Sequence, residues 1–373
     1  MRFSKSKSTH YASTVAAAVG LSASLVFSNA AGASSASHHR HSPTPSQNVA
    51  AGSTFTSSWA QPVPATPSID PNSSSLVNAW VAQMTNSQVG TNNTVGVNYQ
   101  GAAGNPIYTV PANQPNVTVT AKPGCAAFTT ASSSDPDAVD VVPIPAAAIT
   151  SGSGDSPLII NQPSTNTEWE FWQASPNSDG TWSACNGGKL PNYTTSKGVF
   201  DNGSVDGYGM SASGASYLGT LLTEGDVSSG SINHAMAFTV ESNPGGAPYN
   251  DCNGFVAPAN RADPACTQPG EPPEGTRMIM PKSVPMPPGL TPLAQMVFTA
   301  LQNYGLVLVD SSGQYVMAQA ESSCDSPGAC TAGMQSVSSP QDPITQAMGG
   351  QPEWSAFDGI PWNDLQVLTP VSF

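Results

Sequence analysis

Two segments of the chain carry apolar residues at helical spacing. From 72 to 84 the apolar side chains recur every three or four positions, and Ser74 or Ser75 can cap the first turn. The second segment starts with Thr291 as a cap and Pro292 in the first turn, and Gly305 ends it. The pattern therefore predicts two short helices, at 72–84 and 291–304.

Most other apolar residues lie in short runs rich in β-branched and aromatic side chains, separated by Gly, Pro, Asn and Ser. These runs predict strands at 94–99, 116–120, 139–142, 158–161, 167–174, 232–240, 276–280, 306–310, 314–319 and 365–368. The stretch from Asp310 to Gly313 is typical of a hairpin turn. Many short strands and two clear helices predict a mainly β fold, and specifically a β-sandwich or jelly-roll-like domain with two short packed helices.

The first 33 residues have the composition of an export signal. Three basic residues precede an apolar stretch from 14 to 27, and Ala-Gly-Ala at 31–33 offers a cleavage site before Ser34. The apolar stretch is shorter than the roughly 20 residues that a membrane-spanning helix needs. We therefore expect a signal peptide over 1–33 and a secreted, extracellular protein with no membrane span. The alternative is an uncleaved N-terminal anchor.

Residues 34–68 are mostly Ser, Ala, Pro, Thr and Gln, which bury little apolar surface, so we expect a disordered linker there. The remaining 305 residues, 69–373, fit a single β-rich domain. All 24 acidic residues but only six of the ten basic ones lie after residue 69, which gives this domain a formal net charge of −18. Such a charge disfavours nucleic acid and anionic lipid as partners.

Six cysteines lie in the predicted domain, at Cys125, Cys185, Cys252, Cys266, Cys324 and Cys330. In an oxidising compartment they are expected to form three disulfides. Six cysteines allow 15 pairings, and the short spacings favour 252 with 266 and 324 with 330, which leaves 125 with 185. No C-x-x-C spacing is present, so we expect no zinc site, and no motif predicts a cofactor.

Seven segments occur in a fixed order between residues 142 and 368. They are Val142–Pro145, Thr167–Ala174 with Asp179–Trp182, Ser211–Gly214, Gly230–Phe238, Pro273–Arg277, the predicted helix leading into Tyr304–Asp310, and Pro361–Leu368. Together they resemble an uncharacterised family of secreted β-rich proteins of actinobacteria and other soil bacteria. The resemblance covers roughly 142–370 and implies an architecture and an extracellular setting, but no catalytic residue. Where that family has Asp-Gly-His before a strand, this chain has Asp155-Ser156-Pro157.

Two acids and a tryptophan alternate along the predicted strand 167–174. Because alternate side chains of a strand share a face, Glu168, Glu170 and Trp172 point one way, with the two carboxylates about 6 to 7 Å apart. Paired carboxylates beside an aromatic ring are what a glycosidase or a sugar-binding face requires. The alternative is a strand with one buried aromatic face and one solvated acidic face.

His234 is the one histidine of the predicted domain, so any imidazole chemistry there depends on it. It is a candidate general base with Glu168 and Glu170, and its alternative is a buried, hydrogen-bonded role in the fold. Trp172, Trp182 and Arg277 are the candidate substrate contacts. For Arg277 the alternative is an ion pair with a neighbouring carboxylate.

Two functions remain open from the sequence alone. The first is an extracellular protein that binds or cleaves a neutral polysaccharide on a sandwich face, because a charge of −18 repels polyanions. The second is a non-catalytic extracellular or cell-envelope module in which all of these residues serve the fold. A cleft that brings His234 together with Glu168 and Glu170 would favour the first.

Overall fold

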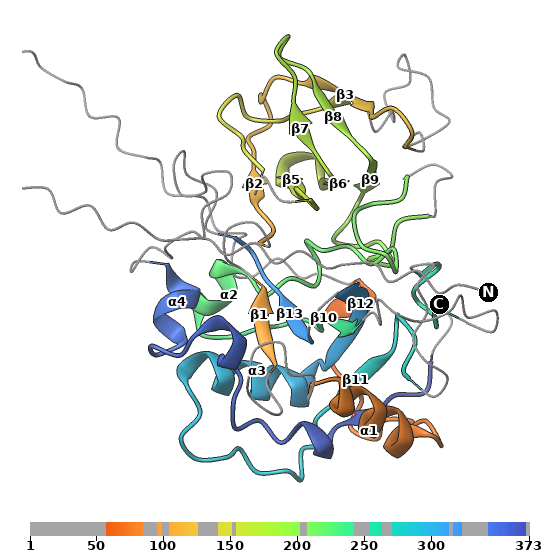
Figure 1. Cartoon of the computed structure of the whole chain (residues 1–373), viewed down its shortest axis with the longest axis vertical. Coiled ribbons are helices and arrows are strands. Elements are labelled where there is room, and N and C mark those ends of the chain that lie inside the picture. Colours follow the sequence, from red (N-terminus) through yellow and green to blue (C-terminus); the bar gives the residue numbers. More distant parts are fainter. Residues whose placement is uncertain are drawn as a thin grey trace, which may run out of the picture. The chain divides into compact units, whose positions relative to one another are not determined.

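The computed structural model describes residues 57–84, 95–98, 104–125, 141–150, 154–201, 207–241, 254–262, 271–312, 316–322 and 342–370. These residues form three sheets with 14 strands, together with four short α-helices (Figure 1). The fold is therefore mainly β, as predicted. The more specific sandwich or jelly-roll architecture stays a prediction.

The largest sheet has six strands in the order β1-β13-β10-β12-β11-β14. Their bounds are β1 (Gly96–Asn98), β10 (Met236–Glu241), β11 (Arg277–Ile279), β12 (Leu306–Ser312), β13 (Met317–Gln319) and β14 (Gln366–Val367). β10 and β12 pair in parallel at the centre, and antiparallel pairs join β11 to both β12 and β14. All six strands lie where apolar runs predict strands.

Helices cover one face of this sheet. They are α1 (Ser73–Gln83), α2 (Glu224–Ser229), α3 (Pro292–Asn303) and α4 (Pro343–Ala347). Apolar residues of α1, α3 and α4 share one core with β10, β12 and β14, in which Trp80 packs edge-on against Phe238 and Trp362. Both predicted helices are confirmed. The Thr291 hydroxyl accepts the Ala294 N–H, and Gly305 adopts φ +85°, which glycine tolerates, where α3 ends.

The two smaller sheets have four strands each. One is ordered β2-β5-β6-β9, with β2 (Ile107–Thr109), β5 (Leu158–Gln162), β6 (Thr167–Trp172) and β9 (Asn186–Pro191). The other is ordered β4-β3-β8-β7, with β3 (Val117–Ala121), β4 (Val141–Val142), β7 (Ser175–Pro176) and β8 (Trp182–Ala184). Trp169, Phe171 and Trp182 lie in a core shared by these two sheets.

The hairpin predicted at Asp310 is wrong. The two strands around it, β12 and β13, belong to the same sheet, but β10 lies between them and pairs with both. Local turn composition could not reveal this, because the partner strand comes from 236–241, about 70 residues earlier in the chain.

Part of the predicted linker is packed. Residues 58–60 form the 3-10 helix η1 (Ser58–Ala60), and Trp59 is only 1% exposed. Its indole N–H donates to the Gly198 carbonyl at 2.7 Å. The folded region therefore begins before Ile69, because one large aromatic side chain anchors an otherwise small and polar stretch. The other described 3-10 helices are η4 (Pro163–Thr165), η5 (Glu353–Ser355) and η6 (Trp362–Asp364).

One disulfide lies within the described residues. It joins Cys125 to Cys185 with their Cα atoms 5.0 Å apart, which confirms that predicted pair. The other four predicted disulfide cysteines, Cys252, Cys266, Cys324 and Cys330, lie outside the described residues, as does the predicted signal peptide. None of the described helices has the length and hydropathy that a membrane span requires.

Candidate functional site

The two acids of β6 share a face, as the alternation predicts, but that face is fully covered. Glu168 and Glu170 are both 0% exposed. β6 lies between β5 and β9, and the cross-strand neighbours Ile159 and Leu190 belong to a core that also contains Met210, Tyr217 and Leu218. The segment 207–222, which has no regular helix or strand, therefore covers the acidic face and excludes water from it.

Glu170 organises this covering segment through its carboxylate. Its Oε1 accepts the backbone N–H groups of Tyr217 at 2.5 Å and Leu218 at 3.2 Å, and its Oε2 accepts that of Met210 at 3.4 Å. Burial raises the pKa of Glu170 to about 7, although these three donors and the charge of Arg261 lower it. The acid is thus a hydrogen-bond acceptor for a loop that lacks secondary structure of its own.

The carboxyl group of Glu168 lacks hydrogen bonds comparable to those of Glu170. Neither of its carboxyl oxygens has a hydrogen-bond partner of normal geometry among the described residues. Burial raises its pKa well above the ordinary value, the Glu170 charge raises it further, and the nearby Ser216 hydroxyl lowers it. Ionising this carboxyl would place a second charge beside Glu170 without water, so the setting favours its protonated form.

A buried cation that the sequence analysis did not single out lies near Glu170. Arg261 donates to the carbonyls of Tyr208 and Ser211, and its guanidinium lies 5.7 Å from the centre of the Tyr208 ring. Burial lowers the pKa of Arg261 to about 10, while the charges of Glu170, Glu274 and Asp310 raise it. One indication of Arg261 was present in the sequence, because basic residues are scarce and it is one of only six after residue 69.

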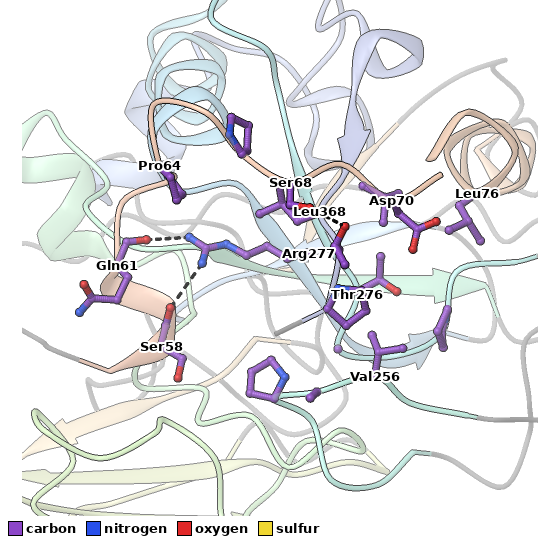
Figure 2. Close-up of a pocket in the computed structure, with 18 of the residues that line it drawn as sticks. Ser58, Gln61, Pro64, Ser68, Asp70, Leu76, Val256, Thr276, Arg277 and Leu368 are labelled. Carbon is purple, nitrogen blue, oxygen red and sulfur yellow. Dashed lines mark hydrogen bonds between the residues drawn. The ribbon is translucent and has the colours of Figure 1, made fainter. Parts of the chain in front are cut away.

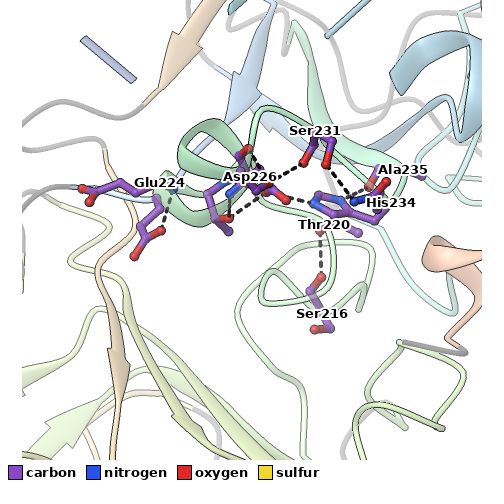
Figure 3. Close-up of polar contacts among 11 residues, drawn as sticks. Ser216, Thr220, Glu224, Asp226, Ser231, His234 and Ala235 are labelled. Atoms are coloured by element: carbon purple, nitrogen blue, oxygen red, sulfur yellow. Dashed lines mark hydrogen bonds and ion pairs between the residues drawn. The ribbon is translucent and has the colours of Figure 1, made fainter. Parts of the chain in front are cut away.

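His234 does not join the two glutamates. It precedes β10, which starts at Met236 and not at Ile232 as predicted, because residues 232–235 form an irregular connection after α2. The imidazole contacts Asp226 through Nε2 at 3.2 Å and the Ala235 carbonyl through Nδ1 at 3.0 Å (Figure 3). Burial lowers the pKa of His234, but the carboxylate of Asp226 and both hydrogen bonds raise it more, so the net shift is upward.

Asp226 also caps the first turn of α2. Its side chain accepts the Thr223 N–H at 3.0 Å and the Thr223 hydroxyl at 2.7 Å, and Thr223 in turn accepts the Asp226 N–H. This reciprocal arrangement is a capping box. The pair of His234 and Asp226 thus fixes the turn between α2 and β10, which is the hydrogen-bonded role that the sequence left open for His234.

This pair predicts a pH-dependent contribution to stability. We expect His234→Gln to lower the free energy of unfolding by about 1 kcal/mol near pH 6, because an ion pair that is largely shielded from water is lost. The folded-state pKa of His234 is raised above its ordinary value of 6.5. The stabilisation is therefore complete below pH 6.5 and disappears as the pH rises through the folded-state pKa. Urea unfolding at about pH 6 and about pH 9 measures the difference. An equal loss at both pH values would contradict the prediction, because it would mean that the charge of the imidazole does not change between them.

The three predicted substrate contacts are dispersed. The indole N–H of Trp172 donates to Asp155 Oδ1 at 3.1 Å at a partly exposed position. Trp182 is only 6% exposed, because it packs in the core between the two smaller sheets. Arg277 donates to three backbone carbonyls, at 2.5 and 2.8 Å to that of Tyr304. It also donates at 2.8 Å to the Gln61 carbonyl and at 3.4 Å to the Ser58 carbonyl (Figure 2). It forms no ion pair with any described carboxylate, contrary to the alternative considered from the sequence.

The acid–base groups of β6 are present, but both are fully buried. Two carboxyls with raised pKa values on one strand face are a common basis for general acid–base catalysis. Full burial separates them from bulk water, and two large cavities among the described residues, of about 550 and 880 Å³, are lined by neither glutamate. No described set of three His, Cys, Asp or Glu side chains is arranged to hold a metal ion.

One of these cavities, which we call the amide groove, lies among α2, α3 and α4 beside the turn that holds His234. It has a volume of about 880 Å³. Its hydrogen-bonding side chains are Ser228, Ser231, Asn233, Gln295, Thr299, Asn303 and Gln346. Met286, which is 43% exposed, and Met296 supply apolar surface. No charged residue lines the groove, which was not predicted because its amides are scattered over more than 100 residues of sequence.

Comparison of this chain with protein-family models, with curated proteins and with solved structures finds no match. Its function therefore has to be inferred from the chemistry of the amide groove and of the buried acids.

Proposed function

We propose that this chain is an exported protein that binds a neutral polysaccharide in the amide groove without cleaving it. The observation that carries the proposal is the uncharged lining of the groove in a domain whose formal net charge is −18. Amide and hydroxyl side chains both donate and accept hydrogen bonds, which matches the hydroxyl groups of a sugar. The exposed methionine offers an adaptable apolar contact for a sugar ring.

Binding is favoured over cleavage because of where the acids lie. A glycosidase needs two carboxyl groups in contact with the scissile bond. Glu168 and Glu170 are fully buried, and the Glu170 carboxylate accepts hydrogen bonds from backbone N–H groups. Export is supported by the Cys125–Cys185 disulfide, since such bonds persist in oxidising compartments. A resemblance to secreted proteins of soil bacteria agrees with this setting.

Titration of the full chain with soluble neutral polysaccharides, and with a uronan as the charged comparison, tests the proposal. We expect binding to a neutral glycan and none to the uronan. Asn233→Ala and Gln295→Ala should each raise Kd about two- to tenfold, because one neutral hydrogen bond contributes about 0.5 to 1.5 kcal/mol. Asn363→Ala removes an exposed amide outside the groove and should leave Kd unchanged.

The two alternatives give different results in the same experiment. Release of reducing ends by the wild type that is abolished in a folded Glu170→Gln variant would favour cleavage at the buried acids. No binding to any glycan would favour the non-catalytic structural module. Groove variants with wild-type affinity would place the glycan elsewhere on the protein.

A further inference from the structure

A second cavity, which we call the proline cavity, has a volume of about 550 Å³, within the roughly 300 to 1,000 Å³ typical of small-molecule sites. It lies between the segment 58–70, the loop 256–258 and the C-terminal stretch 367–370 (Figure 2). Its lining is mainly apolar, with Leu76, Val256 and Leu368 beside six prolines. The prolines are Pro62, Pro64, Pro67, Pro258, Pro273 and Pro370.

Arg277 is the one basic side chain in this lining, and Asp70 is the one acidic side chain. Asp70 Oδ1 accepts the Asn72 N–H at 2.7 Å, and it forms no ion pair with Arg277. Burial lowers the pKa of Arg277 to about 10, and no described carboxylate offsets that effect. The guanidinium is thus partly withdrawn from water, and among the described residues it is compensated by carbonyl dipoles alone, which leaves it able to gain from an anion.

The hydrogen bonds of Arg277 leave room for such an anion. Nε and Nη2 use their N–H groups on the carbonyls of Tyr304 and Gln61. Among the described residues Nη1 makes one long bond, 3.4 Å to the Ser58 carbonyl, so within this part of the chain one of the five guanidinium N–H groups remains for a ligand. The backbone contacts hold the guanidinium in place, so an incoming carboxylate meets a preorganised donor.

We propose that the proline cavity binds a small monocarboxylate with an apolar tail, its carboxylate on Arg277 and its hydrocarbon against the prolines. This site is separate from the amide groove and takes a ligand of different chemistry. A polyanion would be repelled by a domain of charge −18, whereas a single carboxylate meets less repulsion and its tail gains from leaving water.

Calorimetric titration of the full chain with decanoate, decanol and decylamine tests the proposal. We expect decanoate to bind at least about tenfold more tightly than decanol, because a hydrogen bond to a charged group is stronger than a neutral one, and decylamine not to bind. Octanoate, two methylenes shorter, should bind about fifteenfold more weakly than decanoate. Equal affinity for the acid and the alcohol, or no binding of decanoate, would overturn the proposal.

Two variants and a control locate the ligand. Arg277→Gln keeps a donor for the carbonyls but removes the charge, and should reduce the affinity for decanoate to that for decanol. Lys282→Gln removes a charge from an exposed position outside the cavity and should have no effect. If Arg277→Gln does not fold, Thr66→Trp, which fills the cavity from an exposed position, should weaken decanoate and decanol alike by more than about tenfold. Unchanged decanoate affinity in Thr66→Trp, or an equal loss in Lys282→Gln, would refute the assignment.

Discussion

Replacing Glu170 by alanine is expected to lower the free energy of unfolding by about 3 to 5 kcal/mol near pH 5. The substitution leaves a cavity and removes the acceptor of three buried backbone N–H groups, from Met210, Tyr217 and Leu218. Near pH 5 Glu170 is largely protonated in the folded chain, so the measurement reports packing and hydrogen bonding with little contribution from charge. Urea unfolding measures the loss.

Glu168→Ala is the matched control, because it removes the same volume from the same buried strand face but no hydrogen bond of normal geometry. It should cost about 1 to 3 kcal/mol less than Glu170→Ala. Hydrogen exchange gives a second readout, since the Tyr217 and Leu218 amides should exchange faster in Glu170→Ala alone. Equal losses in the two variants would show that Glu170 contributes only volume.

Stability is also expected to fall as the pH rises from 4.5 to about 8. Below 4.5 Glu170 is protonated in both folded and unfolded chains, and above its folded-state pKa of about 7 it is ionised in both. Between these values the folded chain holds a proton that the unfolded chain releases, so raising the pH favours unfolding. The difference corresponds to about 3 kcal/mol. Glu168, whose pKa is also raised by burial and by the Glu170 charge, adds to the loss in the same direction.

The double variant Glu168→Gln/Glu170→Gln should lack most of this slope, because neither amide ionises. Its stability relative to the wild type should therefore improve from about pH 5 to about pH 8 by about 3 kcal/mol or more. The comparison isolates the two glutamates, since His234 and the other titrating groups are present in both proteins. Parallel pH profiles would mean that water reaches the carboxylates.

The sequence predicted individual elements better than their arrangement. The helix that becomes α3 has a cap, a first-turn proline and a terminal glycine, all local signals, and it appears within one residue of its expected bounds. The order of strands in the largest sheet depends on contacts between distant segments. For that reason β10 could come between β12 and β13 while turn residues at Asp310 indicated a hairpin.

The candidate site was predicted only in part, because it too depends on contacts between distant segments. Alternation correctly predicted that Glu168 and Glu170 share a strand face. It could not predict that 207–222 covers that face, because this segment has no periodic pattern and is held by backbone N–H groups, which every sequence possesses. Trp59 was missed because a single aromatic residue in a Ser- and Pro-rich stretch scarcely alters its composition.

The six-stranded sheet collects strands from both ends of the described chain. β1 begins at Gly96 and β14 ends at Val367, and the core that they share also holds Phe357 and Trp362. Such long-range pairing closes large loops and slows folding. During synthesis, the first two thirds of the chain lack the partners that bury their apolar face. This sheet can be completed only after nearly the whole chain has been made, so its folding follows synthesis, whereas the strands of the two smaller sheets are all made by Pro191.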